Sequence, residues 1–421
     1  MHRVRVLPFL CAAALAVLAA CGQWRRVGSE AAPDPNVLVP QLFDAAAIYR
    51  EMGFLAAGAP LPFVAGVRFL AGPTGDSTLA VFGLSLANRA LSFRRAGSVF
   101  EARYRVEVSF RINGRIVGQI AQDETVRVAS FPETQRPDES VIFQRFIALP
   151  PGPLEVAVAL RDRFGSGFSR VSGNVGVPRF GVGPALSSIV PVYEGRPRAD
   201  RTVLPDFVVN PRATVPYGGD TLQIYVEAYR PDSGRAVIRL LSEEQEAREV
   251  WRDTVSLGGE LTGAIVRIAP ERLPVGALTV QAFIPEERDT VRAPALVSFS
   301  DQWVVANFDE TLFLLRYFGQ DDAIREMRET SDATERLALW RQFWEATDPN
   351  PRTPENEALD HYFRRLQEAN RRFGEGSDPG WLTDRGEVYI TLGEPDEIFD
   401  SSSDLQGRGQ RFIRWSYISL H

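Results

Sequence analysis

The sequence contains no lysine, so all 47 basic residues are arginine. Without lysine the chain cannot form the Schiff bases of lysine-dependent enzymes, and it cannot supply the lysine of a phosphate-binding loop. Histidine is nearly as scarce, since the chain contains only His2, His361 and His421. Catalysis that needs lysine is excluded, and catalysis that needs histidine has few residues to draw on.

Cysteine is equally rare. Cys11 and Cys21 are the two that are present, and both lie near the amino terminus. We expect Cys11 to be removed with a leader and Cys21 to carry lipid. The mature chain would then have no disulfide, no thiolate nucleophile and no thiolate metal ligand.

The amino-terminal segment has the pattern of a bacterial secretory signal. Arg3 and Arg5 precede an apolar run at residues 6–20, which is too short to span a bilayer comfortably. The run ends in Leu-Ala-Ala-Cys at residues 18–21, which resembles a lipobox. In a lipobox, small residues precede a cysteine that becomes the acylated first residue. The alternative interpretation is an ordinary signal peptide followed by an incidental cysteine.

These features predict where the protein resides. We expect a lipoprotein signal peptide at residues 1–20, lipidation of Cys21 and a polar tether at residues 21–40. Gly22, rather than Asp, follows the cysteine, which by resemblance to Gram-negative lipoproteins favours the outer membrane. The predicted location is therefore the cell envelope, with the protein facing the periplasm or the cell surface. Its membrane contact would be the acylated Cys21.

Composition limits the other possibilities. The chain is 44% hydrophobic and 24% charged, as is usual for globular proteins, and 421 residues favour two or three domains. Its net charge of −7 offers no electrostatic footprint for nucleic acid. No later apolar run is long enough to span a membrane.

The first half of the chain has mainly the period-two pattern of strands. After an amphipathic helix predicted at 41–58, residues 62–193 and 201–300 each predict an antiparallel, immunoglobulin-like β-sandwich. Asn113-Gly114 is a residue pair that favours a tight hairpin turn. Residues 195–200 form a plausible boundary between the sandwiches.

The pattern becomes helical in residues 303–421. Apolar residues at helical spacing between 357 and 373 predict a long amphipathic helix that ends near Gly374. The alternation of Val388, Ile390 and Leu392 with polar or amphipathic neighbours predicts a strand. Residues 412–420 are predicted to form the last strand and to pair with it. The predicted fold is multidomain, mainly β and then α+β: two sandwiches followed by a helical carboxyl-terminal domain that ends in a β-hairpin.

The carboxyl-terminal part resembles the GWxTD-domain family of bacterial envelope proteins. Gly-Trp-Leu-Thr-Asp stands at residues 380–384, and residues 343–351, 383–390 and 392–398 also match the family pattern. The resemblance is strong over residues 305–421. It implies no substrate and no catalytic residue, because the family is functionally uncharacterised. The family pattern also leads us to expect one more strand, so the domain would be truncated if His421 is a premature stop or a fragment boundary.

We interpret the family motif as a structural turn. Trp381 is expected to pack back on the preceding helix, against Phe373 or Ala369, with its N–H on a backbone carbonyl. The short polar side chains of Thr383 and Asp384 are suited to capping backbone amides. The motif residues are Gly380, Trp381, Thr383, Asp384, Arg385 and Gly386.

Residues that could carry chemistry are few. Glu357 and His361 stand one helical turn apart and are weak candidates for metal ligands, but no HExxH motif accompanies them. We assign no catalytic residue, no metal and no cofactor.

The function that we favour is a lipid-anchored envelope protein that binds a protein or glycan, and the alternative is a carboxylate-dependent hydrolase of envelope glycan or peptide. Two carboxyl groups converging in a deep cleft would favour the hydrolase.

Overall fold

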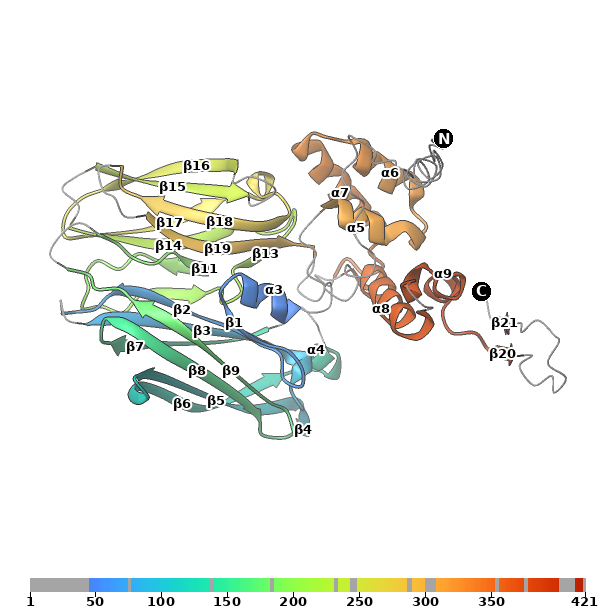
Figure 1. Cartoon of the computed structure of the whole chain (residues 1–421), viewed down its shortest axis with the longest axis horizontal. Coiled ribbons are helices and arrows are strands. Elements are labelled where there is room, and N and C mark those ends of the chain that lie inside the picture. The colour runs from blue at the N-terminus through green and yellow to red at the C-terminus, as the bar shows by residue number, and fades with distance from the viewer. Residues whose placement is uncertain are drawn as a thin grey trace, which may run out of the picture. The chain divides into compact units, whose positions relative to one another are not determined.

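The structure is a computed structural model of the chain, shown in Figure 1. It describes residues 45–74, 77–135, 140–181, 185–230, 234–242, 248–285, 290–299, 308–352, 356–374, 378–400 and 413–418. The predicted signal peptide, Cys21, the predicted tether and His421 lie outside the described residues. All described residues belong to one compact unit, Pro35–His421.

The first β region forms two antiparallel sheets, here called sheet 1 and sheet 2. Sheet 1 has the order β1-β2-β3-β7, and in sheet 2 the order is β4-β5-β8-β9 with β6 also paired to β5. Sheet 1 consists of β1 (Leu55–Ala57), β2 (Phe63–Ala71), β3 (Thr78–Ala87) and β7 (Ser140–Leu149). Sheet 2 consists of β4 (Arg94–Ala96), β5 (Val99–Ile112), β6 (Arg115–Val128), β8 (Gly152–Asp162) and β9 (Phe168–Val177).

The turn between β5 and β6 is the one that the sequence predicts. Asn113 and Gly114 have positive φ values of 49° and 79°, and Ile112 pairs directly with Arg115 across the two-residue loop. Asn and Gly accept this backbone conformation at low cost. The predicted hairpin is confirmed.

The second β region forms sheet 3 and sheet 4. Sheet 3 has the order β10-β14-β11-β12 with β17 also paired to β14, and sheet 4 has the order β13-β19-β18-β15-β16. Their strands pair antiparallel except for β13 with β19. Sheet 3 consists of β10 (Ala185–Leu186), β11 (Val190–Arg196), β12 (Asp206–Val209), β14 (Leu222–Tyr229) and β17 (Leu261–Ile268). Sheet 4 consists of β13 (Thr214–Pro216), β15 (Gly234–Ser242), β16 (Arg248–Leu257), β18 (Gly276–Phe283) and β19 (Thr290–Ser298).

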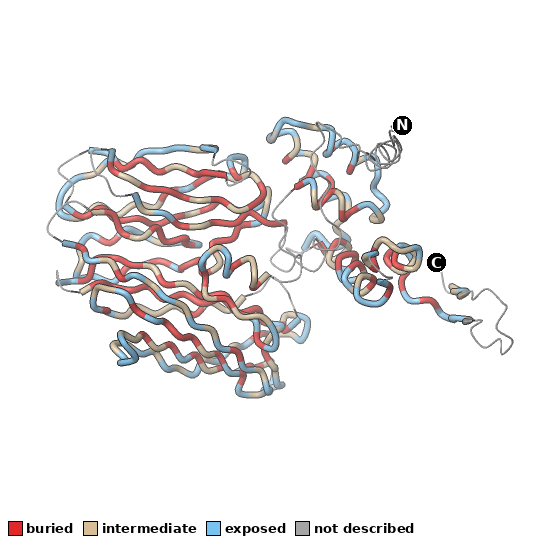
Figure 2. Tube along the Cα trace, in the orientation of Figure 1, coloured by how far each residue is buried: buried red, intermediate tan, exposed pale blue. Residues whose placement is uncertain are grey.

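Each pair of sheets encloses an apolar core, and a third apolar layer joins the pairs. Phe82 and Val106 belong to the core between sheets 1 and 2, and Ile224 and Val280 to the core between sheets 3 and 4. A further cluster contains residues of sheets 1 and 3, among them Val81. Figure 2 shows the buried residues along these inner layers.

The boundary between the sandwiches differs from the prediction. β10 and β11 pair with β14 and belong to sheet 3, although the sequence placed residues up to 193 in the first sandwich. The cause is that an apolar strand has the same pattern whichever sheet it joins, so periodicity does not reveal its partner. The segment 197–205 lies between β11 and β12, within the second sandwich.

The helix predicted at 41–58 is shorter in the structure. α3 (Ala45–Glu51) is followed by Gly53 with φ of +86° and then by β1. A glycine in this left-handed conformation ends a helix readily. Residues 55–57, which follow this glycine, form a strand that pairs with β2.

The carboxyl-terminal domain is helical around one aromatic-rich core, which includes Trp340, Phe363 and Trp381. Its α-helices are α5 (Phe308–Leu314), α6 (Asp321–Glu329), α7 (Ala333–Thr347), α8 (Glu357–Phe373) and α9 (Asp384–Leu392). The remaining helices are α4 (Phe131–Gln135), in the first β region, and the 3₁₀ turns η1 (Asn88–Ala90), η2 (Pro270–Arg272), η3 (Leu315–Tyr317) and η4 (Gly380–Leu382).

The strand predicted at residues 388–392 is wrong, because these residues lie in α9. Gly386 and Ile390 form the buried face of the helix at a spacing of four, whereas Leu392 is 42% exposed. A run of five alternating residues is too short to distinguish a strand from a helix. The predicted terminal hairpin exists, but it is formed by β20 (Glu397–Asp400) and β21 (Ile413–Ser416).

Candidate functional site

The family motif forms the connection between α8 and α9. The Thr383 hydroxyl accepts a hydrogen bond from the Gly386 backbone amide at 3.1 Å and donates one to the Gly380 carbonyl at 2.8 Å. Thr383 is thus the N-cap of α9, as a threonine before a helix commonly is. Asp384 is exposed and makes no hydrogen bond through its side chain to the described residues.

The two glycines of the motif allow a close approach of the backbone. A Cβ atom on Gly380 would lie 2.3 Å from the Ala369 carbonyl oxygen, and one on Gly386 would lie 1.9 Å from the Gly380 carbonyl oxygen. Both distances are far below van der Waals contact. No other residue fits without moving the backbone.

Trp381 is fully buried, with 0% of its surface exposed. Its ring packs edge-to-face against Phe313 at 5.5 Å between centroids, and the guanidinium of Arg316 lies 5.4 Å from the indole ring. The turn that carries Trp381, η4, contacts α8 as expected, and the indole makes ring contacts with Phe313 and Tyr317. The expected hydrogen bond is wrong, because Nε1 is buried without a hydrogen-bond partner among the described residues. A buried indole offers no surface for stacking a ligand.

The weak metal candidates do not assemble into a site with other ligands. Glu357 begins α8, and His361 lies one turn later in an open hollow with Arg364 and Arg365. Burial, followed by the charges of Arg365 and Arg364, lowers the pKa of His361. Within the described residues no group of three His, Cys, Asp or Glu side chains could hold a metal ion.

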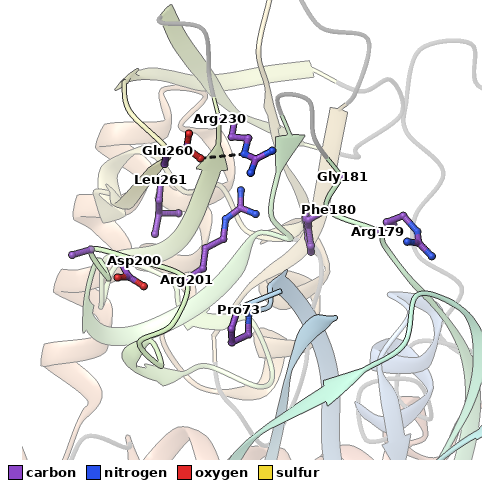
Figure 3. A pocket seen from close by; sticks show the side chains of 10 residues that line it. Pro73, Arg179, Phe180, Gly181, Asp200, Arg201, Arg230, Glu260 and Leu261 are labelled. Carbon is purple, nitrogen blue, oxygen red and sulfur yellow. Dashed lines mark hydrogen bonds and ion pairs between the residues drawn. The ribbon is translucent and has the colours of Figure 1, made fainter. Parts of the chain in front are cut away.

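A cleft with a volume of about 650 Å³ is lined by residues of the first and second β regions. Figure 3 shows Arg201 and Arg230 with their guanidinium groups directed toward one another, while Arg179 points away from them. The lining contains three arginines and two carboxylates. The lining residues are Pro73, Arg179, Phe180, Gly181, Ala199, Asp200, Arg201, Arg230, Glu260 and Leu261.

Both carboxylates of the cleft are already engaged. Glu260 accepts a hydrogen bond from Nε of Arg230 at 3.1 Å. Asp200 accepts two from Thr202, from the hydroxyl and from the backbone amide, each at 2.6 Å, and these bonds lower the pKa of Asp200. Asp200 therefore lacks the raised pKa of a general acid.

A buried ion pair fixes the chain beside the cleft. Nε and Nη2 of Arg198 donate to the two carboxylate oxygens of Glu227 at 2.6 and 2.8 Å, and Tyr225 and Tyr229 also donate to that carboxylate. Nη2 of Arg198 donates as well to the Ala71 carbonyl at 2.8 Å, so the pair links sheet 1 to sheet 3.

The charge of this pair is favoured despite its burial. Burial by itself lowers the pKa of Arg198, but the hydrogen bonds and charge of Glu227 outweigh burial and raise that pKa. Burial, together with Glu227, raises the pKa of Tyr229. The tyrosine hydroxyls therefore act as donors to the carboxylate.

Sequence reasoning did not find the cleft. Arg179, Arg201 and Arg230 lie on separate segments, which the fold brings to the lining of one cleft, and the sequence does not reveal that arrangement. The one available signal is the basic, proline-containing segment at 195–200, whose pattern predicts a domain boundary.

The described residues thus define a β-rich protein of two stacked sandwiches with a helical carboxyl-terminal domain and an arginine-lined cleft. The family model described as GWxTD domain matches residues 290–408. Residues 290–408 of the chain therefore form a member of the GWxTD-domain family, as the sequence predicts. No curated protein matches the chain. Every described helix falls short of the length and apolarity that a membrane span requires.

Solved structures show low similarity to the chain. Trypsin-activated alpha-2-macroglobulin from Escherichia coli is 14% identical with a TM-score of 0.19, and the match covers 58% of this chain and 17% of that chain. Salmonella alpha-2-macroglobulin reacted with methylamine is 14% identical with a TM-score of 0.18 and the same coverage. The BSP domain of a biofilm-associated protein is 9% identical with a TM-score of 0.17, covering 60% of this chain and 54% of that chain.

Proposed function

We propose that this protein is a lipid-anchored binding protein of the bacterial cell envelope, which holds a protein or glycan partner at the arginine-lined cleft. The anchor is the acylated Cys21, which follows a signal peptide and a lipobox-like sequence. The proposed membrane is the outer membrane, with the folded part in the periplasm or at the cell surface.

One observation favours a binding function over a hydrolase. The two carboxylates of the cleft, Asp200 and Glu260, are each held by a donor, and the remaining charged groups of its lining are arginines. A carboxylate-dependent hydrolase needs one carboxyl group with a raised pKa and a second one placed across the scissile bond. Arginine remains protonated and serves well for recognition.

The anchor is tested by cell fractionation. Cys21→Ser should move the protein out of the membrane fraction, because the acylated residue is lost. Cys11→Ser is the matched control, since Cys11 lies within the predicted leader and should leave the protein at the membrane. If the Cys21→Ser protein stays at the membrane although its leader has been cleaved, the lipid anchor is contradicted.

Binding is tested with the delipidated protein and purified envelope glycan fragments and peptides, scoring retention and product in the same samples. We expect saturable, reversible binding that Arg201→Gln weakens, without product. Formation of product that Glu260→Gln or Asp200→Asn abolishes supports the hydrolase instead. If none of the fragments or peptides binds and no product forms, the proposed function at this cleft is contradicted.

A further inference from the structure

We infer that the cleft recognises a small ligand, or the end of a larger one, through an oxyanion, a carboxylate or a phosphate, that accepts hydrogen bonds from Arg201 and Arg230. This inference rests on the proposed function in taking the cleft as the binding site. It adds the chemical group that the cleft recognises.

The first step of the argument is the unbalanced charge. Arg201 and Arg230 direct their guanidinium groups toward one another (Figure 3), and Glu260 pairs with Arg230. Among the described residues no carboxylate forms an ion pair with Arg201. Two adjacent like charges repel, and an anion between or beside them relieves that repulsion.

The second step is an unused donor. Nη2 of Arg201 is buried and has no hydrogen-bond partner among the described residues. A buried donor without a partner is costly, whereas a guanidinium can satisfy two donors at once with one carboxylate or phosphate. A rotation of the guanidinium toward the cleft would expose this donor, and the oxyanion would then supply the acceptor that the protein lacks at this atom.

The third step is the rigid floor under Arg201. Its guanidinium lies 4.6 Å from the ring centroid of Tyr229, and Phe180 packs edge-to-face on the same ring at 5.0 Å. The Tyr229 hydroxyl donates to Glu227 and accepts from the Ala71 amide at 2.7 Å, so the ring is fixed. A guanidinium stacked on a fixed ring loses little further entropy when it binds a ligand.

The backbone adds to this preorganisation. Arg198 donates to the Arg201 carbonyl at 3.2 Å, and Arg230 has a positive φ of 46° with its amide bonded to the Glu260 carbonyl at 3.0 Å. A non-glycine residue at positive φ is uncommon and is found at functional sites more often than elsewhere. The backbones of both arginines are therefore held in place by the buried network and by the Glu260 segment.

Size and overall charge restrict the ligand further. A cleft of about 650 Å³ suits a small molecule or one terminal group of a polymer. The whole chain has a net charge of −7, so a long anionic polymer would be repelled away from the cleft. Local attraction at the arginines and general repulsion elsewhere favour a compact anion.

The test compares probes that share one body. Calorimetry with glucose, glucuronate and glucose 6-phosphate separates the neutral sugar from the carboxylate and the phosphate, and inorganic phosphate tests the anion alone. We expect at least one anionic probe to bind about tenfold or more tightly than glucose, the usual size of a charge-assisted hydrogen bond. Added salt should weaken that preference.

Substitutions of equal size should act in opposite directions. Arg201→Gln should weaken anion binding about tenfold or more, and Glu260→Gln should strengthen it because a competing carboxylate is removed. Arg95→Gln, which removes an exposed arginine on β4, is the matched control and should change nothing. If Arg201→Gln fails to fold, Arg230→Gln and Glu260→Gln carry the same test.

Failures of the two proposals can be told apart. The oxyanion inference is overturned if no anionic probe binds more tightly than glucose, or if the Glu260→Gln and Arg201→Gln proteins have the same affinity. Glycan or peptide binding at the cleft would still leave the proposed function intact. Turnover of a glycan or peptide overturns the proposed function, whatever the preference for anions.

Discussion

The guanidinium of Arg198 and the carboxylate of Glu227 form a two-bond ion pair with 1% and 0% of their side chains exposed. Every carboxylate oxygen of Glu227 also accepts from a tyrosine, so the charge is fully coordinated. The pair lies where sheet 1 meets sheet 3 and supports the floor of the cleft through Tyr229. A buried ion pair loses its hydration on folding, so its presence is weak evidence for net stability, whereas the loss of one partner is costly.

Removing one partner of this pair should destabilise the protein strongly. Glu227→Gln leaves the Arg198 charge buried without compensation, and we expect a loss of about 3–5 kcal/mol in the free energy of unfolding. Urea unfolding measures it. Glu260→Gln removes the partner of an exposed pair and should cost little. The double variant Arg198→Gln/Glu227→Gln should lose less than the two single losses together, and simple additivity would contradict the coupling.

Local sequence signals predict individual helices and turns better than they predict which strands pair. The apolar positions of α8, from Leu359 to Phe373, are buried as the helical spacing predicts, and Asn113-Gly114 makes the predicted turn. In both cases the signal depends on residues that are close in sequence. The strand that would pair with β14, and the meeting of Arg201 with Arg230, depend on contacts between distant segments. The sequence alone therefore predicted two sandwiches but neither their boundary nor the cleft.

The close approach at the family motif predicts that alanine is not tolerated there. Gly386→Ala would place Cβ 1.9 Å from a backbone oxygen that cannot rotate away, and we expect a loss of about 3 kcal/mol or more. Thermal unfolding of the variant measures it. Gly258→Ala is the control, because a Cβ atom there meets nothing within 4 Å. Equal stability of the Gly386→Ala and Gly258→Ala proteins would show that η4 and α9 are not packed as described.

The capping role should belong to Thr383 rather than Asp384. Thr383→Ala removes the acceptor of the Gly386 amide and should cost about 1–2 kcal/mol. Asp384→Ala removes only the favourable interaction of a first-turn carboxylate with the helix dipole and should cost about 0.3–1 kcal/mol. Chemical denaturation of both variants gives the order. A larger loss for Asp384→Ala would assign the cap to the carboxylate, and unchanged stability with lost partner binding would make Asp384 functional.

The His361 environment predicts a stability that depends on pH. Burial, then Arg365 and Arg364, lower the pKa of His361 in the folded protein below its unfolded value of about 6.5. The unfolded chain therefore takes up this proton first as the pH falls. The contribution is fully present above about pH 6.5 and is lost as the pH falls through the lowered folded value.

The same hollow is lined by Glu368 and Glu394, whose pKa values are lowered by hydrogen bonds from Arg371 and Arg372, so both carboxylates remain charged while His361 titrates. Between about pH 7.5 and about pH 5.5, the wild-type protein should lose more free energy of unfolding than His361→Gln, which lacks the titrating group but shares every carboxylate. Urea unfolding at both pH values gives the two slopes. A steeper loss in His361→Gln would mean that protonated His361 is stabilised in the fold, by an acceptor that outweighs the two arginines.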